Sequence, residues 1–191
     1  MPGGDHEGMD LDVVFTGRGL VLPAGQRGLP GLPEDGEVRL EDIRDADPDA
    51  APPEVRTAGG LTLFVTALQR RELTAFCGRH AVPLRRRPDV WADLLGPFLD
   101  TEETAGQRTA ALERLSAIGL DEARVTRIRE RVAPLMIAYN ALHWDWHHLG
   151  LCDLLDAAAA PWIPERVRRG LGDLGEFRVW AMRIADIPTA P

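Results

Sequence analysis

Short runs of β-prone residues characterise the first third of the chain. Gly17 to Gly19 separate the first two runs, and this pattern predicts a hairpin. Residues 23–36 carry four glycines and three prolines and are predicted to form a loop. Residues 45–53, which are acidic and contain three prolines, are predicted to form a linker or an exposed loop. The predicted strands are residues 12–16, 19–22, 38–43 and 61–66.

From Leu68 onwards the apolar residues recur with the period of a helix. Five helices are predicted: from Leu68 to just before Pro83, from Asp89 to about Gly96, from a cap at Asp100 or Thr101 to Gly119, from a cap at Asp121 to about Ala159, and from Pro164 to Arg169. The fourth of these is expected to kink or break at Pro134 before it resumes, because proline removes a backbone donor from the helix.

Residues 176–187 fit either a strand or a helix, and the strand is preferred because a glycine precedes them. The strand would place Trp180, Met182 and Ile184 on one side. The predicted fold class is therefore α+β, with a small antiparallel sheet of N-terminal strands and a C-terminal strand packed on a helical bundle.

The expected organisation is a flexible leader over residues 1–10 and a single α+β domain over residues 11–191. Within that domain, residues 11–60 form an acidic strand and loop region, and residues 61–191 form a mainly helical core. The formal net charge of −8 resides in the first 60 residues, where 13 acids face five arginines, while the remainder is balanced. This acidic region is interpreted as a solvated segment, with an acidic docking surface as the alternative.

Composition excludes several mechanisms. All 22 basic residues are arginine, so a Schiff-base lysine and a phosphate-loop lysine are both impossible. The single serine, Ser116, lies on a predicted helix without the turn that exposes a serine nucleophile. The arginine runs at residues 85–87 and 166–169 are short, and the negative net charge argues against nucleic acid as a partner.

Several bulk features indicate a cytoplasmic protein. No segment reaches the roughly 18 uncharged apolar residues of a membrane span, and the acidic N-terminus is unlike a secretory signal. Cys77 and Cys152 are expected to remain reduced. The use of arginine without lysine, together with abundant alanine, glycine and proline, indicates a high-GC bacterial genome.

The densest polar chemistry lies between residues 139 and 153, where three of the five histidines fall within six residues. On a continuous helix, an apolar seam that includes Tyr139 and Trp146 would divide the polar residues into two flanks. Asn140, His143 and His147 form one flank, and Asp145, His148 and Cys152 form the other.

His143 and His147 are four residues apart, the spacing by which one helix offers two imidazoles to Zn, Fe or Mn. His80 is the candidate third ligand, and a bound water would be the nucleophile of a metal-dependent hydrolase. Asp145, His148 and Asn140 would support the ligands through hydrogen bonds. The structural alternative is that these histidines are boundary residues of the core, since no glutamate follows His143 as in zinc proteases.

Two further features of the same helical region indicate binding. Trp144 lies opposite the apolar seam and is the candidate for a partner surface. The helix is apolar on more than one face, so homodimerisation is expected there.

The arginine row Arg124, Arg127 and Arg131 is interpreted as a solvated face, with a clamp for phosphate or nucleic acid as the alternative.

The preferred interpretation is a non-enzymatic intracellular binding or interaction protein that meets a protein partner or a second copy of itself. The alternative is a metal-binding protein or metal-dependent hydrolase that uses the His143 and His147 pair. No sequence motif identifies a family or a catalytic residue.

Overall fold

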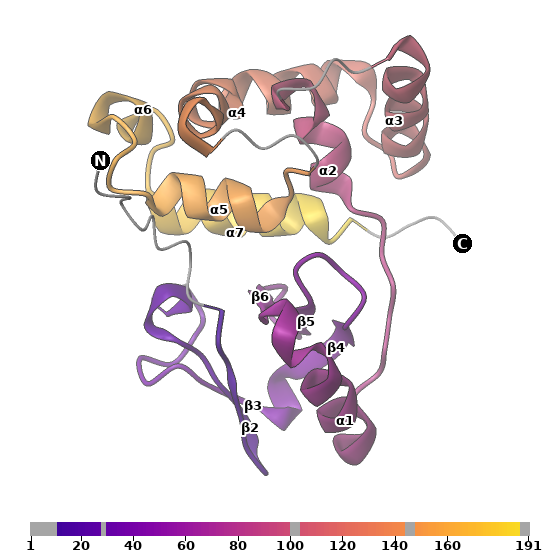
Figure 1. Ribbon diagram of the computed structural model, residues 1–191, viewed down its shortest axis with the longest axis vertical. Coiled ribbons are helices and arrows are strands. Elements are labelled where there is room, and N and C mark those ends of the chain that lie inside the picture. Colours follow the sequence, from indigo (N-terminus) through magenta and orange to yellow (C-terminus); the bar gives the residue numbers. More distant parts are fainter. Residues whose placement is uncertain (1–10, 28–29, 100–103, 144–147, 188–191) are drawn as a thin grey trace. The chain divides into compact units, whose positions relative to one another are not determined.

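The computed structural model describes residues 11–27, 30–99, 104–143 and 148–187 (Figure 1). The chain divides into two compact units at the Arg86–Arg87 bond. In its described parts it is an α+β protein, as predicted, with two three-stranded antiparallel sheets and seven α-helices. Residues 1–10, the predicted leader, lie outside the described residues, and the single domain over residues 11–191 stays a prediction.

The first sheet of the N-terminal unit contains β1 (Val14–Phe15), β2 (Gly19–Val21) and β3 (Glu37–Arg39). The predicted hairpin is confirmed, because β1 pairs antiparallel with β2. Gly19 has a φ of +153°, and a Cβ there would lie 2.0 Å from the carbonyl oxygen of Val38. Only glycine therefore allows this close approach of β2 to β3.

The second sheet contains β4 (Ile43–Asp47), β5 (Glu54–Thr57) and β6 (Thr62–Phe64). Strand β6 confirms the buried strand expected at residues 61–66. The strand expected at residues 38–43 is divided, because a 3-10 turn over Leu40–Asp42 ends β3 and leads into β4.

The loop predicted at residues 45–53 is wrong at its start, because Asp45 and Asp47 are buried in β4. Asp45 Oδ1 lies 3.3 Å from Arg56 Nη1 on β5, and Asp45 Oδ2 lies 2.9 Å from Arg44 Nε. Arg56 also pairs with Glu54. A buried carboxylate requires such a partner, and no local pattern reveals it.

Two glutamine side chains complete the hydrogen bonding of the N-terminal unit. Gln26 is buried, and its amide both accepts from Phe64 N and donates to Phe64 O, each at 2.7 Å. Gln69 makes the equivalent pair with Val13, at 3.0 and 2.8 Å. Each amide therefore takes the place of a neighbouring strand for one residue.

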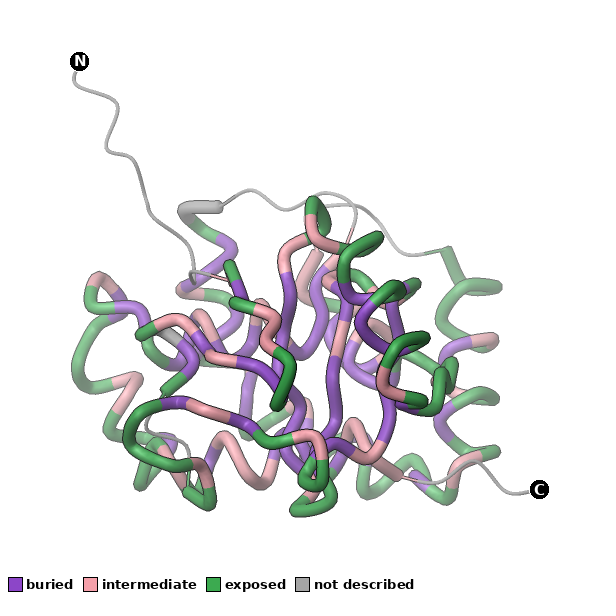
Figure 2. Tube along the Cα trace, turned by 90° about the horizontal axis from the view of Figure 1, so that it is seen from below, coloured by how far each residue is buried: buried purple, intermediate pink, exposed green. Residues whose placement is uncertain are grey.

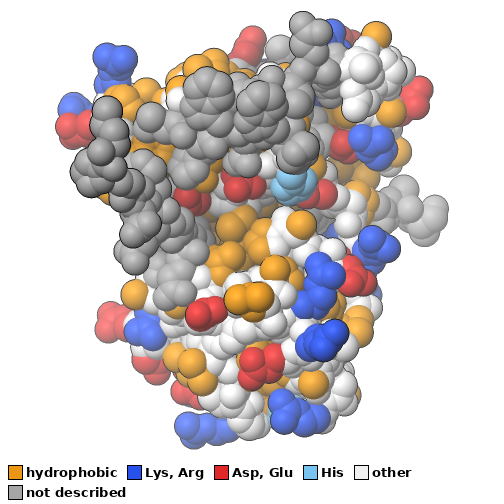
Figure 3. Space-filling view, in the orientation of Figure 1, with side chains coloured by type: hydrophobic (Ala, Val, Ile, Leu, Met, Phe, Trp, Pro, Cys, Tyr) orange, Lys and Arg blue, Asp and Glu red, His pale blue; other side chains and the backbone are white. Residues whose placement is uncertain are grey.

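Helix α1 (Arg70–His80) forms where the helical period was predicted. It buries Phe76 and Cys77, and the Phe76 ring lies 5.3 Å from that of Phe15 on β1. On the face drawn in Figure 3, acidic and basic side chains are interspersed over this unit.

The C-terminal unit contains the other six described helices. They are α2 (Val90–Leu95), α3 (Ala105–Ala117), α4 (Glu122–His143), α5 (Leu151–Ala159), α6 (Glu165–Arg169) and α7 (Leu174–Ala185). Helices α2 and α5 each contact both α4 and α7. Along the helices, buried residues alternate with exposed ones, because each helix packs one side against the unit (Figure 2).

Most helix starts follow from capping side chains. Asp121 accepts from Arg124 N at 2.7 Å, which confirms the predicted cap, and Asp89, where a helix was predicted to begin, caps α2. The cap of α3 is Thr104, in a capping box with Gln107, so the expectation of a cap at Asp100 or Thr101 is wrong.

Helix α4 continues through Pro134 to His143, so the helix does not break there, and the kink expected as the alternative stays a prediction. The long helix predicted from Asp121 to about Ala159 is wrong at its end. Residues 148–150 are not helical, and α5 begins only at Leu151. The N–H of Gly150 donates to Asp153 in the first turn of α5, at 2.7 Å, which marks a new helix start.

The strand preferred for residues 176–187 is also wrong, because this segment belongs to α7. Asp173 caps the helix by accepting from Glu176 N at 2.8 Å. Phe177, Ala181 and Ile184, spaced at i, i+4 and i+7, form its buried face. No helix among the described residues has the length and apolarity needed to cross a bilayer.

Candidate anion-binding groove

One face of α4 carries a row of arginines. Arg124, Arg127 and Arg131 are exposed and lie at spacings of three and four, so they share one side of the helix. The adjacent stripe predicted to be apolar is buried and packs into the unit; it consists of Val125, Ile128, Val132 and Leu135. The arginine row is therefore fixed in place by a well-packed helix.

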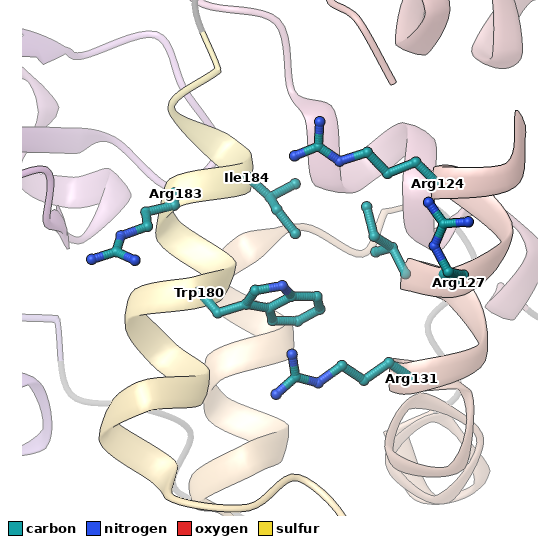
Figure 4. A pocket seen from close by; sticks show the side chains of 7 residues that line it. Arg124, Arg127, Arg131, Trp180, Arg183 and Ile184 are labelled. Carbon is teal, nitrogen blue, oxygen red and sulfur yellow. The ribbon is translucent and has the colours of Figure 1, made fainter. Parts of the chain in front are cut away.

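A cavity of about 450 Å³ opens between this face of α4 and α7 (Figure 4). Its lining combines arginine with apolar side chains and contains no carboxylate. The lining residues are Arg124, Arg127, Ile128 and Arg131 of α4 and Trp180, Arg183 and Ile184 of α7. We call this the α4–α7 groove, and its volume lies within the range of ligand pockets.

Side-chain directions give the groove two ends. Arg124 and Arg131 extend from α4 toward α7, and Trp180 and Ile184 point from α7 toward α4 (Figure 4). The guanidinium groups of Arg124 and Arg131 lie at opposite ends, with Ile184 and the indole between them. Arg183 extends away from α4.

Arg131 is held more firmly than the other lining arginines. Its guanidinium carbon lies 4.1 Å from the centroid of the Trp180 ring, and its Nη2 donates to the carbonyl oxygen of Leu171 at 3.4 Å. Trp180 is itself packed against two rings, at 5.8 Å from Trp91 and 5.4 Å from Phe177. The aromatic cluster thus fixes the plane of the Arg131 guanidinium.

The groove arginines differ in their partners from several other arginines of the unit, which form ion pairs. Arg114 forms a two-point pair with Asp93, which raises the pKa of Arg114, and Arg87 pairs with Asp186. Within the described parts of the chain, the four groove arginines form no ion pair. Because guanidinium stays protonated at any physiological pH, the groove carries uncompensated positive charge.

The predicted metal site stays a prediction. The side chain of His143 and all of Trp144, Asp145 and His147 lie outside the described residues. His80 ends α1 in the other unit, where its ring lies 4.8 Å from that of Phe76. The residues that the structure describes contain no cluster of three or more His, Cys, Asp or Glu arranged to hold a metal.

The residues proposed to support a metal have other contacts. Asn140 is buried, and its Nδ2 donates to the carbonyl oxygen of Phe98 at 2.9 Å. His148 Nε2 lies 2.9 Å from Asp89 Oδ2, so it contacts the capping residue of α2. The flank that would unite His148 with Cys152 on one helix is wrong, because residues 148–150 interrupt the helix.

The arginine row is evident in the sequence, but the surface of α7 that faces it is not. Trp180 was expected on a strand, where it could not be related to Arg131. The spacing of Phe177, Ala181 and Ile184 is the signal that would have placed the indole on a helix.

Comparison of the chain with protein-family models, curated proteins and solved structures found no match. The fold and the groove therefore define the class on physical grounds alone: an α+β protein with an arginine-lined groove in its helical unit.

Proposed function

We propose that this protein acts by binding, without catalysis, and that the α4–α7 groove receives an acidic segment of a protein partner. One observation carries the proposal: four arginines surround one cavity with no carboxylate in its lining. Arginine clusters of this kind recognise acidic or phosphorylated motifs, because each guanidinium can donate two parallel hydrogen bonds to an oxyanion.

The groove lining offers binding groups and no catalytic ones. Arginine, isoleucine and tryptophan supply neither a nucleophile nor a general base near neutral pH. Elsewhere, burial raises the pKa of the Cys77 thiol to about 11, so this thiol stays protonated and inert. The proposal therefore rests on recognition of charge.

An acidic protein segment fits the groove better than nucleic acid does. The C-terminal unit has 12 arginines and 16 acids, so phosphate backbones are repelled beyond the groove itself. The Trp180 face is covered by Arg131 and its surroundings by Trp91 and Phe177, which leaves no open platform for a base to stack on. On the face drawn in Figure 3, acidic and basic side chains are interspersed over the N-terminal unit, whereas the lining of the groove contains arginine and no carboxylate.

The proposal is tested by fluorescence anisotropy with a labelled oligoglutamate peptide. Binding is expected at low ionic strength and should weaken toward about 0.15 M salt. The double variant Arg124→Ala with Arg131→Ala should weaken binding at least about tenfold. Arg166→Ala with Arg169→Ala, which removes two exposed arginines of α6 outside the groove, is the matched charge control. Equal losses in both variants, or no binding at all, would overturn the proposal.

A further inference from the structure

The two ends of the α4–α7 groove are too far apart to hold one anionic group. Arg124 and Arg131 are seven residues apart on α4, which corresponds to an axial rise of about 10.5 Å. Their guanidinium groups point into opposite ends of the groove (Figure 4). A single carboxylate or phosphoryl group therefore cannot contact both, and the groove presents two separate oxyanion sites.

The surface between these two sites is apolar. Ile184 of α7 and the indole of Trp180 lie between the two guanidinium groups (Figure 4), and Ile128 of α4 also lines the groove. Both isoleucines are buried and line the groove, so they offer apolar surface that an aliphatic side chain can contact. A charged group in this central position would lose its hydration without gaining a partner.

We propose that the groove recognises a helical segment that carries acidic residues at positions i and i+7 and an aliphatic residue at i+3 or i+4. This inference rests on the proposed function and specifies the ligand. A helix laid along α4 repeats with the same period as α4, so its acids at i and i+7 face Arg124 and Arg131 together. Only the anchoring side chains enter the groove, which agrees with its volume of about 450 Å³.

The two ends have different roles. The Arg131 guanidinium lies over the Trp180 ring and donates one N–H to Leu171, so its remaining N–H groups are the ones left to meet an oxyanion. Trp180 is thus a positioning residue. The Arg131 end of the groove therefore constrains the position of a bound oxyanion more closely than the Arg124 end does. Arg124 has no such aromatic support among the described residues, so it is the more tolerant end.

The test compares two alanine-based helical peptides of identical composition. Both carry two glutamates and one leucine, but the second glutamate stands at i+7 in one peptide and at i+5, on the opposite face, in the other. The i+7 peptide is expected to bind about tenfold more tightly. In the Arg131→Glu variant, an i+7 peptide whose second glutamate is replaced by arginine should recover binding. If Arg131→Glu does not fold, Arg131→Gln is used instead, and this variant should bind the i+7 peptide less tightly than the native protein does.

Each outcome separates the two proposals. Equal affinity for the i+7 and i+5 peptides, with loss of both in the double arginine variant, would overturn the spacing proposal and leave the proposed function intact. Absence of binding to both peptides and to oligoglutamate would overturn the proposed function. A Trp180→Phe variant that loses as much affinity as Arg131→Ala for the i+7 peptide, but keeps its oligoglutamate affinity, would confirm Trp180 as a positioning residue.

Discussion

The guanidinium of Arg131 lies over the Trp180 ring in the α4–α7 groove, with the guanidinium carbon 4.1 Å from the ring centroid. The pair joins two helices that are contacted in common by α2 and α5. The position of the charged group on α4 therefore depends on the aromatic packing of α7. The coupling free energy between the two side chains can be measured.

A double-mutant cycle on this pair should give a coupling free energy of about 0.5–1 kcal/mol. The variants are Arg131→Met, Trp180→Leu and their combination, and the free energy of unfolding is measured in urea. The sign is favourable because the guanidinium lies over the negative face of the indole. A coupling within error of zero would show that the two side chains are neighbours without mutual stabilisation.

Gln26→Ala should lower the free energy of unfolding of the N-terminal unit by about 2–3 kcal/mol. The substitution leaves both the N–H and the carbonyl of Phe64 buried without their partner. Gln69→Ala is the matched control, because its bonds to Val13 are partly exposed and water can replace them, so it should cost about 1 kcal/mol. Equal costs for the two variants would show that burial does not decide the effect.

Arg56→Met alone should destabilise the protein by about 3–5 kcal/mol, because it leaves the buried Asp45 and the half-buried Glu54 of the second sheet without their shared cation. The double variant Arg56→Met with Asp45→Asn should recover part of that loss. Arg56 Nε has no hydrogen-bond acceptor among the described residues, so the native pair is itself imperfectly satisfied. Urea unfolding of the three proteins tests this, and a double variant worse than Arg56→Met would contradict it.

Alkaline pH should destabilise the fold through Cys77. Burial raises its pKa from 9.0 to about 11, so the neutral thiol is the form that the folded state favours. The stabilisation is complete below pH 9 and is lost as pH rises toward 11, because the unfolded thiol ionises first. With no lysine and one tyrosine in the chain, few other side chains titrate in this window. Cys77→Val should therefore flatten the dependence of the free energy of unfolding on pH between about pH 9 and pH 11.

The binding interpretation predicts that protein purified without a histidine tag carries no stoichiometric zinc, iron or manganese. It also predicts that zinc raises the melting temperature of the native protein no more than that of the variant His143→Ala with His147→Ala. Elemental analysis and thermal melts provide the measurements. Stoichiometric metal that disappears in the variant would replace this interpretation with the metal-binding alternative.

Local patterns predicted the elements whose signals are local. The hairpin at Gly19, the start of α2 after Asp89, the cap at Asp121 and the start of α6 after Pro164 all follow from neighbouring residues. The burial of Asp45 was missed because it depends on Arg56, on another strand.

The α4–α7 groove was missed for a similar reason. The arginine row of α4 is evident in the sequence, but its meaning depends on what faces it. Residues 176–187 are short enough to fit either periodicity, and the cap at Asp173 is the local signal that decides for a helix. With α7 taken as a strand, Trp180 and Arg131 could not be related.

The unpaired arginines of the groove also have a kinetic consequence. Because the chain has a net charge of −8, it repels an acidic partner in most orientations of approach. It attracts the partner only when the partner approaches the groove. The surrounding negative potential then lowers the frequency of encounters in which the partner approaches in the wrong orientation. Added salt would weaken the attraction and the repulsion together, so the association rate would change more than the residence time of the complex.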